Sequence, residues 1–277
     1  MSESQPPRAP SEIISHYDRG VESGRLSSSY GSLELRRTQE ILTRFLPDPP
    51  AIICDVGGGP GIYAAWLARH GYEVHLIDVV ELHVQQALEA SAAQPETPIA
   101  SCTHGDARQL DLEENSVDVT LLLGPLYHLT GRSDRVQALR EAARITRPGG
   151  LVFVAAISRF ASALDGMFRG FIADPEFREI VREDLHSGQH RNPNGRDHFF
   201  TTAYFHRPEE LRIEFASAGL THMQTLAVEG PAGWIQRVTD KWDDSDWAAQ
   251  ILATIKLIEA EPALLGASPH LLAIGRT

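Results

Sequence analysis

The stretch "ICDVGGGPGIYA", residues 53–64, decides the fold because its glycine-rich loop follows an apolar run and precedes a helical pattern. Four of the five positions 57–61 are glycines, which let a backbone turn tightly and approach a ligand closely. A strand over 51–56, this loop and a helix that begins near Ile62 form the context in which such a loop is a binding motif. We therefore expect a ligand site at the end of this strand.

Strand-type runs recur along the chain, and helical patterns separate most of them. The runs lie at 51–56, 73–77, 99–103, 117–123, 150–156, 221–230 and 270–276. Helical patterns at 11–24 and 32–46 precede the first strand, and another at 207–220 has Pro208 in its first position. This alternation predicts right-handed crossovers and a parallel sheet with helices on both faces.

The pattern divides the chain into four parts. Residues 1–50 are an N-terminal helical cap segment, and residues 51–156 are the ligand-binding core. Residues 157–206 hold no clear parallel strand but many aromatic side chains, which predicts an inserted lid over a pocket. Residues 207–277 complete the core and carry an acidic, tryptophan-containing insertion at 231–268.

The composition excludes several classes of protein. The chain has 277 residues, of which 42% are hydrophobic, so it can bury the core of one large elaborated domain. A formal net charge of −12 without a basic cluster argues against nucleic acid as a partner. The N-terminus is polar and no apolar run is long enough to span a membrane, so we expect a soluble, cytoplasmic protein without membrane association.

The cysteine and histidine patterns give little sign of a redox or metal site. Cys54 and Cys102 lie in strand-type segments and are expected to be buried, reduced thiols. His186 and His190 are four residues apart, which would suit a metal on a helix face. Gly188 separates them and no third ligand follows at a recognisable spacing, so we expect no metal.

Two acidic residues help to identify the ligand as one that contains adenosine. Asp78 ends the second strand, where a carboxylate accepts hydrogen bonds from ribose hydroxyls. Asp55 lies two positions before Gly57, where it would repel a pyrophosphate but attract a cationic amino-acid group. The glycine spacing is also G-x-G-x-G rather than the dinucleotide pattern G-x-G-x-x-G. These observations favour S-adenosylmethionine, and a nicotinamide-dependent oxidoreductase stays as an alternative.

The sequence "DVGGGPG" resembles the first signature of the class I S-adenosylmethionine-dependent methyltransferases of the small-molecule type, and "LID" resembles their acidic second signature. The stretches "HGDARQL", "VDVTLLLGPLYHL" and "ITRPGGLVFVAA" are similar to the next three signatures, in order. The resemblance implies an α/β, Rossmann-like, doubly wound sheet of seven strands, mostly parallel with an antiparallel last strand, plus a largely helical cap. The turn "VVELH" after Asp78 departs from the family pattern.

The resemblance also implies how the cofactor is held. Asp106 would contact the adenine amino group, the backbone of Ala107 would meet the ring, and the end of the fourth strand would lie beside the methionine part. Tyr17 would cover the cofactor, with packing in the core as the alternative. The expected cofactor-binding residues are Tyr17, Asp55, Gly57, Gly59, Gly61, Asp78, Asp106, Ala107, Leu123 and Gly124.

Candidates for proton transfer and substrate binding lie after the fourth strand and in the lid. His128 is the first candidate for a general base because a neutral imidazole accepts protons near neutral pH, and His198 and His206 follow it. The expected substrate-binding residues are Tyr127, Arg159, Arg191 and Tyr204, with Arg196 as a further arginine for a carboxylate acceptor. Packing or solvation is the alternative for each of them.

The predicted function is methyl transfer from S-adenosylmethionine to an oxygen, nitrogen or carbon nucleophile of a small molecule, by in-line displacement that gives S-adenosylhomocysteine. Alignment of the nucleophile and exclusion of water supply most of the rate, and a base is needed only for a protonated acceptor. The alternative is a protein of the same fold that binds this cofactor for non-methylating chemistry or regulation. The expected partner is the small-molecule substrate, and a homodimer is left open.

Overall fold

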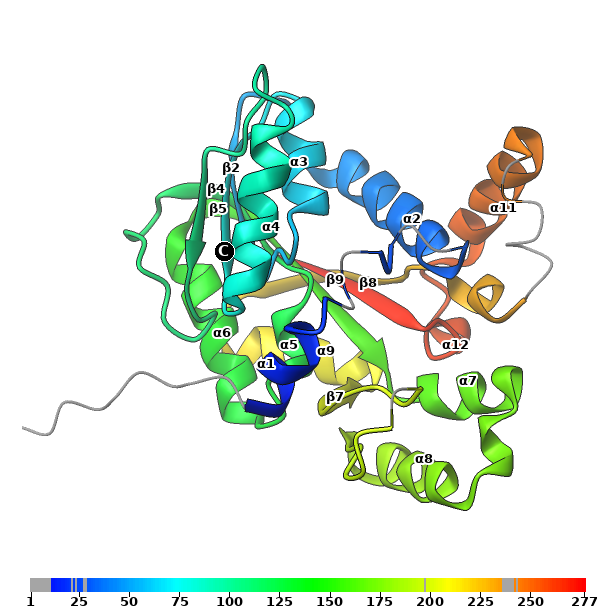
Figure 1. Ribbon diagram of the computed structural model, residues 1–277. Coiled ribbons are helices and arrows are strands. Elements are labelled where there is room, and N and C mark those ends of the chain that lie inside the picture. Colours follow the sequence, from blue (N-terminus) through cyan, green and yellow to red (C-terminus); the bar gives the residue numbers. More distant parts are fainter. Residues whose placement is uncertain are drawn as a thin grey trace, which may run out of the picture.

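The computed structural model describes residues 11–20, 22, 24–26, 29–196, 198–235, 242 and 244–277. Within them, nine strands form one sheet that is flanked by helices (Figure 1). In chain order the elements, with η for 3-10 helices, are α1 (Ser11–Tyr17), α2 (Ser29–Phe45), β1 (Ile52–Val56), α3 (Ile62–Arg69), β2 (Glu73–Asp78), α4 (Glu81–Ala92), β3 (Ser101–His104), β4 (Val117–Leu122), α5 (Pro125–His128), α6 (Arg132–Ile145), β5 (Thr146–Ser158), α7 (Ala161–Arg169), η1 (Phe171–Ala173), α8 (Pro175–Ser187), β6 (Gln189–His190), β7 (Ala203–His206), α9 (Pro208–Ser217), β8 (Thr221–Ala227), η2 (Gly230–Trp234), α11 (Ser245–Ile258), α12 (Pro262–Leu265) and β9 (His270–Arg276).

The sheet has the strand order β3-β2-β1-β4-β5, with parallel neighbours, and continues through β9 to β8. Strand β9 runs antiparallel to both β5 and β8. These seven strands confirm the predicted α/β sheet with its antiparallel last strand. The N-terminal helix is shorter than the predicted 11–24, because α1 ends at Tyr17. Val21, which belongs to the predicted helical stretch, lies outside the described residues.

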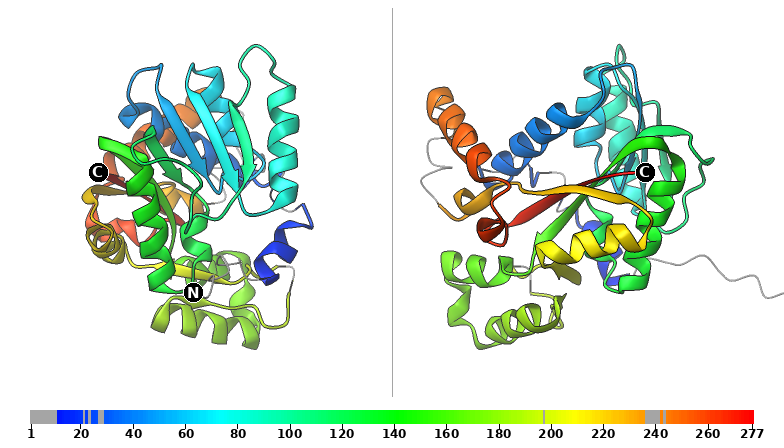
Figure 2. Two further views of the ribbon diagram at one scale, coloured as in Figure 1. Left: turned by 90° about the vertical axis from the view of Figure 1, so that its left-hand side faces the viewer. Right: turned by 180° about the vertical axis from the view of Figure 1, so that it is seen from behind.

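Helices cover both faces of the sheet (Figure 2), so the central strands are apolar on both sides. Leu121 and Leu122 are adjacent in β4 and point to opposite faces, and neither is exposed. Leu121 packs in the core under α2 and α3, and Leu122 packs in the core under α6 and α9. Because β1, β2 and β4 are parallel neighbours, their C-terminal ends meet at one edge of the sheet.

The lid contains a strand that the sequence pattern did not reveal. β7 runs parallel to β5 and pairs Phe205 with Ile157, beyond the point where Val154 of β5 makes its pair with β4. The expectation that residues 157–206 hold no parallel strand is therefore wrong, because β5 is long enough to accept a second neighbour after β4 ends. The lid also contains α7, η1, α8 and the short strand β6, and α7 and α8 lie against each other (Figure 1).

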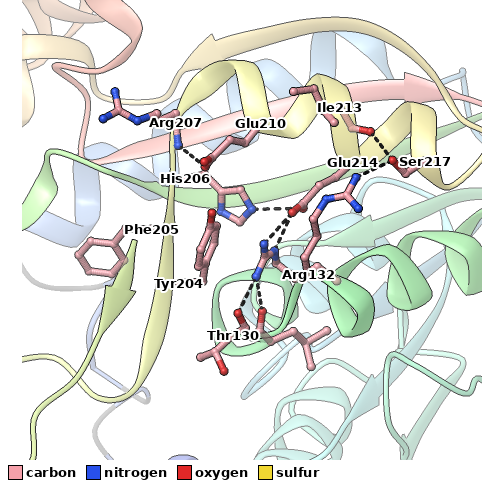
Figure 3. Close-up of polar contacts among 12 residues, drawn as sticks. Thr130, Arg132, Tyr204, Phe205, His206, Arg207, Glu210, Ile213, Glu214 and Ser217 are labelled. Carbon is pink, nitrogen blue, oxygen red and sulfur yellow. Dashed lines mark hydrogen bonds and ion pairs between the residues drawn. The ribbon is translucent and has the colours of Figure 1, made fainter. Parts of the chain in front are cut away.

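A buried polar network joins β7 to α9 and α6 (Figure 3). The guanidinium of Arg135 donates to Glu214 Oε1 at 2.9 Å and to the carbonyl oxygens of Leu129 and Thr130. The other carboxylate oxygen of Glu214 lies 3.3 Å from His206 Nε2. Arg135 and Glu214 are both almost fully buried, so each neutralises a charge that would otherwise be buried without a partner.

Replacing Glu214 by alanine leaves the guanidinium of Arg135 buried without its carboxylate. We expect the free energy of unfolding to fall by about 3–5 kcal/mol, as is typical when one partner of a buried ion pair is removed. Urea denaturation of the purified variant measures the change. A loss below about 1 kcal/mol would mean that the two backbone carbonyl groups alone satisfy Arg135.

Candidate functional site

The glycine loop lies at the C-terminal edge of the sheet and borders a first cavity. Gly57 has φ +69°, and a Cβ there would lie 2.5 Å from the ring of Pro125, so only glycine fits. Gly59 has φ +57°, but the space beside it is open, with the nearest atom, a carbon of Glu22, at 3.9 Å. The loop thus leaves room for a ligand directly over Gly59.

Gly61 has a different role from the one we expected. It does not line the cavity, and a Cβ at this position would lie 3.1 Å from the side chain of Ala87 in α4. Its φ of +84° is also unfavourable for any other residue. The structure therefore places Gly61 at the packing contact between α3 and α4 rather than at the ligand.

Asp78 connects the glycine loop to the start of α4. Its Oδ2 accepts a hydrogen bond from the Gly59 N–H at 2.9 Å, and its Oδ1 accepts one from the Val80 N–H at 2.8 Å. The same Oδ1 lies 3.2 Å from Nδ1 of His83, a residue of the "VVELH" turn that we had not selected. Asp78 lines the cavity, so its carboxylate is held where the sequence predicted a ribose.

Asp55 is fully buried behind the loop, and neither of its carboxylate oxygens has a hydrogen-bond partner. Burial and the nearby charge of Asp78 raise the pKa of Asp55 to about 7. An unpartnered carboxyl group beside a cavity gains a compensating charge when a cationic ligand enters. The sequence predicted such a role for Asp55, and that role stays a prediction.

Asp106 and Ala107 lie at the opposite end of the same cavity. Asp106 accepts hydrogen bonds from the backbone N–H of Arg108 at 2.8 Å and from its guanidinium at 2.7 and 2.9 Å. The carboxylate is therefore fixed by its own turn, as a cap would be, and still borders the cavity. Leu123 and Gly124, after β4, border the cavity too, so nine of the ten predicted cofactor residues surround one space.

Tyr17 and His128 form the main polar pair of this edge. The Tyr17 hydroxyl lies 2.7 Å from His128 Nε2, and His128 Nδ1 lies 3.3 Å from the carbonyl oxygen of Thr202 in the lid. Since a carbonyl only accepts, the proton of the ring belongs on Nδ1, and Nε2 accepts from Tyr17. Burial lowers the pKa of His128 to about 4 and raises that of Tyr17 well above its usual range, so both are neutral at pH 7.

A second cavity of about 370 Å³ adjoins the first on the side of the lid. Its wall includes several aromatic residues, as is usual for a small-molecule site, namely Phe168, Phe177, Phe199, Phe200, Phe205 and Trp234, and it also carries charged residues such as Asp165 and Arg169. Tyr17 and Tyr127 border both cavities, and His198 borders the second. Phe200 stacks against His128 with ring centroids 5.9 Å apart, so the lid packs directly on the polar pair.

His206 and Tyr204 do not face either cavity, which corrects their predicted roles. His206 is fully buried and paired with Glu214, and burial lowers its pKa despite that neighbour (Figure 3). The ring of Tyr204 covers the guanidinium of Arg135 at 3.6 Å. Both aromatic side chains stabilise the junction of β7 with α6 and α9 instead of contacting a substrate.

The three arginines proposed for substrate binding also lie outside the cavities. Arg159 is buried and donates to Glu210 and to the carbonyl oxygen of Phe205. Arg191 donates to the side chain of Gln189 and to neighbouring backbone carbonyl groups. Exposed Arg196 pairs with acidic residues at the start of α8. Arg159 and Arg196 are thus paired with acidic residues and Arg191 with neutral groups, and none of the three borders either cavity.

The histidine pair that suggested a metal is divided by the end of α8. His186 is exposed, whereas His190 is buried in β6 with Nδ1 2.9 Å from Asp184. Among the described residues, a different group has ligand atoms within 4.8 Å of one another, namely Glu34, Glu229 and His270. No sequence spacing links these three, which come from α2, the end of β8 and the start of β9. Cys54 and Cys102 are free thiols, the first buried and the second half-buried.

The fold and this edge define the class of protein. Residues 54–154 match the family model of a methyltransferase domain. Three structural features agree with this match. They are the strand order of the sheet, the glycine loop with an unpartnered acidic residue behind it, and the acidic residue at the end of β2. Residues 54–154 therefore form a methyltransferase domain, and the fold is shared with S-adenosylmethionine-dependent methyltransferases.

Similar proteins support this assignment. An O-methyltransferase of Pyrenophora dematioidea is 34% identical over 121 residues, which are 43% of this chain and 44% of that protein. The ubiquinone biosynthesis O-methyltransferase of Caulobacter vibrioides is 28% identical over 195 residues, or 70% of this chain and 66% of that protein. This chain thus spans only 44–66% of the length of these two curated relatives.

Solved structures share the fold at low identity. A S-adenosylmethionine-dependent methyltransferase from Methanosarcina mazei has a TM-score of 0.57 and 15% identity, and the match covers 86% of this chain and 96% of that one. The cyclase SpnF has a TM-score of 0.55 and 18% identity, with coverage of 87% and 80%. These likenesses concern the fold alone.

No helix among the described residues has the length and apolarity needed to cross a bilayer.

The residues of the first cavity fit the cofactor. The open space over Gly59 suits a ligand that approaches the backbone closely, and Asp78 offers carboxylate oxygens at the end of β2 where ribose hydroxyls are bound in such folds. Asp55 offers an uncompensated buried carboxyl group for a ligand with two cationic centres. Asp106 and Ala107 border the far end of this cavity, which is therefore the end that would take the adenine.

A methyl group on Gly59 should block the cofactor. Gly59→Ala and the control Gly219→Ala place a Cβ at similar positive φ angles, +57° and +84°, and each should lose about 1–2 kcal/mol of stability. Gly219 follows α9, outside both cavities. We expect calorimetry to show weaker S-adenosylhomocysteine binding for Gly59→Ala alone. Equal affinity in the two variants would show that the ligand does not approach this position.

The affinity for S-adenosylmethionine should increase as the pH rises toward 7. Below that pH Asp55 is protonated in the free protein, and a cationic ligand favours the carboxylate, so binding must release a proton. The dissociation constant should therefore increase by at most about tenfold for each pH unit below 7 and level off above it. Calorimetry in buffers of different ionisation enthalpy measures the proton release, and Asp55→Asn should abolish it. A wild-type affinity that is constant from pH 6 to 8 would contradict the role of Asp55.

Proposed function

We propose that the protein transfers the methyl group of S-adenosylmethionine to a hydroxyl group of a small, largely apolar aromatic molecule that occupies the second cavity. The observation that carries this proposal is the Tyr17–His128 pair at the junction of the two cavities. Tyr17 borders both spaces, and its hydroxyl lies 2.7 Å from His128 Nε2. When bound, the cofactor supplies an electrophilic methyl group on a positively charged sulfur.

The Tyr17–His128 pair provides a path for the proton of the acceptor. The Tyr17 oxygen receives a hydrogen bond from the acceptor hydroxyl while its own proton is directed at His128 Nε2. His128 keeps its other proton on Nδ1, where the Thr202 carbonyl oxygen accepts it at 3.3 Å. Proton removal thus passes through Tyr17 to His128, which faces only the first cavity.

The low pKa of His128 is compatible with this role. Burial favours the neutral ring, so His128 has a free acceptor atom at every pH above about 4. An oxygen that gains a methyl group becomes a far stronger acid than the original hydroxyl, and even a weak base accepts its proton. His128 therefore acts late in the transfer, while Tyr17 orients the oxygen from the start.

The second cavity supports a flat, apolar acceptor. Its aromatic wall offers faces for ring stacking, and its volume of about 370 Å³ suits a molecule of drug-like size. The two curated relatives described above are named as O-methyltransferases, which agrees with an oxygen acceptor. A third, from Acidiphilium cryptum, is named as a C-methyltransferase at 28% identity, so the acceptor atom must be tested.

Incubation with a panel of phenols, amines and activated carbon acids tests the activity. We expect S-adenosylhomocysteine and a methyl ether to form in equal amounts from a phenol. Turnover of an acceptor without formation of S-adenosylhomocysteine would instead identify a non-methylating enzyme of this fold. A methylated amine or carbon product would retain the methyltransferase activity and reject the hydroxyl acceptor.

Tyr17→Phe removes the hydroxyl of the proton path and keeps the ring that packs against Val80. We expect kcat at pH 7 to fall by about 100-fold or more, while the affinity for S-adenosylhomocysteine changes by no more than a few-fold. The defect should shrink as the pH approaches the pKa of the acceptor, because an ionised acceptor needs no base. His128→Ala should show the same pH profile.

Tyr127→Phe is the matched control, because Tyr127 also borders both cavities and its hydroxyl donates to the Leu123 carbonyl oxygen at 3.4 Å instead of to His128. It should keep most of the turnover. A Tyr17→Phe enzyme with a wild-type pH profile would rule out the proposed path and leave Tyr17 as a packing residue.

A further inference from the structure

The wall of the second cavity contains a buried histidine–aspartate pair that the proposed function does not use. His190 of β6 borders this cavity, and its Nδ1 lies 2.9 Å from Oδ2 of Asp184 in α8. Its Nε2 lies 3.2 Å from the carbonyl oxygen of Phe200. The ring therefore joins α8 to residues 200–202, which belong to no helix or strand. We call Asp184, His190 and the Phe200 carbonyl group the lid clamp.

Both contacts of the His190 ring need a proton on the nitrogen concerned, because a carbonyl oxygen and an ionised carboxylate only accept hydrogen bonds. A ring with a proton on each nitrogen is a cation, and Asp184 supplies the opposite charge. Asp184 is fully buried, and its Oδ1 has no hydrogen-bond partner among the described residues. His190 is therefore the group that compensates this carboxylate, and the same proton count gives it a donor for Phe200.

The segment that the lid clamp holds contacts His128 in two ways. The carbonyl oxygen of Thr202 accepts from Nδ1 of His128 at 3.3 Å. The ring of Phe200 stacks on the ring of His128, with centroids 5.9 Å apart. The other side of the attachment is rigid too, since the ring of His190 stacks on Phe205 of β7 at 4.7 Å. The clamp thus lies two residues from the carbonyl group that faces His128.

We infer that His190 is a positioning residue for methyl transfer, because the lid clamp keeps the Thr202 carbonyl group in place and so keeps the proton of His128 on Nδ1. The inference rests on the proposed function in one respect, namely that His128 accepts the proton of Tyr17. With its own proton on Nδ1, His128 can accept at Nε2, where the Tyr17 hydroxyl lies at 2.7 Å. A proton on Nε2 would instead face Tyr17 with a second donor.

The Thr202 carbonyl group is what distinguishes the two neutral forms of His128. Burial lowers the pKa of His128 to about 4, so at pH 7 one ring nitrogen holds a proton and the other does not. The Tyr17 hydroxyl beside Nε2 can donate or accept and is compatible with either form. The carbonyl oxygen beside Nδ1 can only accept, so it favours the form with the proton on Nδ1.

A direct role as the base for the acceptor is the competing role of His190, because its ring borders the second cavity. The ring is 1% exposed, and both of its nitrogens are engaged within the protein. A doubly protonated imidazole has no lone pair with which to accept a proton. His190 would have to release Phe200 before it could act on a substrate, so the geometry favours positioning over proton transfer.

The double variant Asp184→Leu/His190→Phe tests the inference without leaving a buried charge. Replacing both partners by apolar groups of similar shape is often nearly neutral for stability, and the new phenyl ring can still stack on Phe205. We expect kcat with the phenol that the acceptor panel selects to fall by about 10- to 100-fold, because the base is misplaced. The affinity for S-adenosylhomocysteine should stay within about threefold, since neither residue borders the first cavity.

NMR of the imidazole nitrogens supplies a readout that a merely structural role would not move. Long-range ¹⁵N–¹H spectra at pH 7, without substrate, show which nitrogen of His128 holds the proton, and His128→Ala identifies its signals. We expect the proton on Nδ1 in the wild type and a mixture of both forms in the double variant.

Asp184→Asn is the conservative variant that should rescue the clamp. Its amide can donate to Nδ1 of His190 while a proton on Nε2 still binds Phe200. This variant should therefore keep the wild-type form of His128 and most of the turnover. A Asp184→Asn enzyme with the defects of the double variant would mean that the clamp does not act through Phe200.

His206→Phe is the matched control, because His206 is a second buried histidine of the lid, lies 3.3 Å from the carboxylate of Glu214 and borders neither cavity. Glu214 keeps Arg135 as its partner. The control should leave the His128 proton on Nδ1 and kcat within about threefold. If the double variant keeps the wild-type form of His128, or if His206→Phe alters it equally, the inference is wrong.

Failure of the proposed function has a different signature. Tyr17→Phe and the double variant would then both keep full turnover, whatever the form of His128. A defect in Tyr17→Phe together with full turnover in the double variant would retain the proposed proton path and overturn the positioning role of His190. A defect in both, with the mixed form of His128 in the double variant alone, is the result that we expect.

Discussion

The carboxylate of Asp78 is the group on which the arrangement of the functional edge depends. It stands at the end of β2 and accepts hydrogen bonds from Gly59 in the glycine loop and from Val80 before α4. Val80 in turn packs against Ile13 and Tyr17, so α1 rests on the same short segment. This one buried carboxylate thereby fixes both the glycine loop and the segment at Val80 on which α1 packs.

Much of the fold could be predicted from the sequence because the signals are local. The alternation of apolar runs and helical patterns marked seven of the nine strands of the sheet, and the loop after 51–56 borders the first cavity. Residues that follow a parallel strand directly, such as Asp78, Leu123 and Gly124, reach the cavity because all those strands end at one edge. Position along a strand was therefore a sufficient guide to their location.

The residues that sequence reasoning misplaced are polar groups of the lid and its neighbour α9. The mixture of aromatic and basic residues near His206 and Tyr204 is compatible with a pocket wall and also with a buried polar network. The structure forms the buried network because Glu210 and Glu214 of α9 supply its acidic partners. Those glutamates look like ordinary surface residues in the sequence. The cluster of Glu34, Glu229 and His270 escaped notice for a related reason, because these residues lie far apart in the sequence and only the fold brings them together.

The strand β7 restricts how the active site can open. A lid attached only by flexible connections at its two ends could rotate away as a flap, but Phe205 and His206 at the end of this one pair with β5 in parallel register. Opening it as a unit would break strand pairs of the central sheet. Access for the acceptor therefore depends on other parts of the enclosure, such as the seven-residue helix α1, whose Tyr17 borders both cavities and which is not part of the sheet.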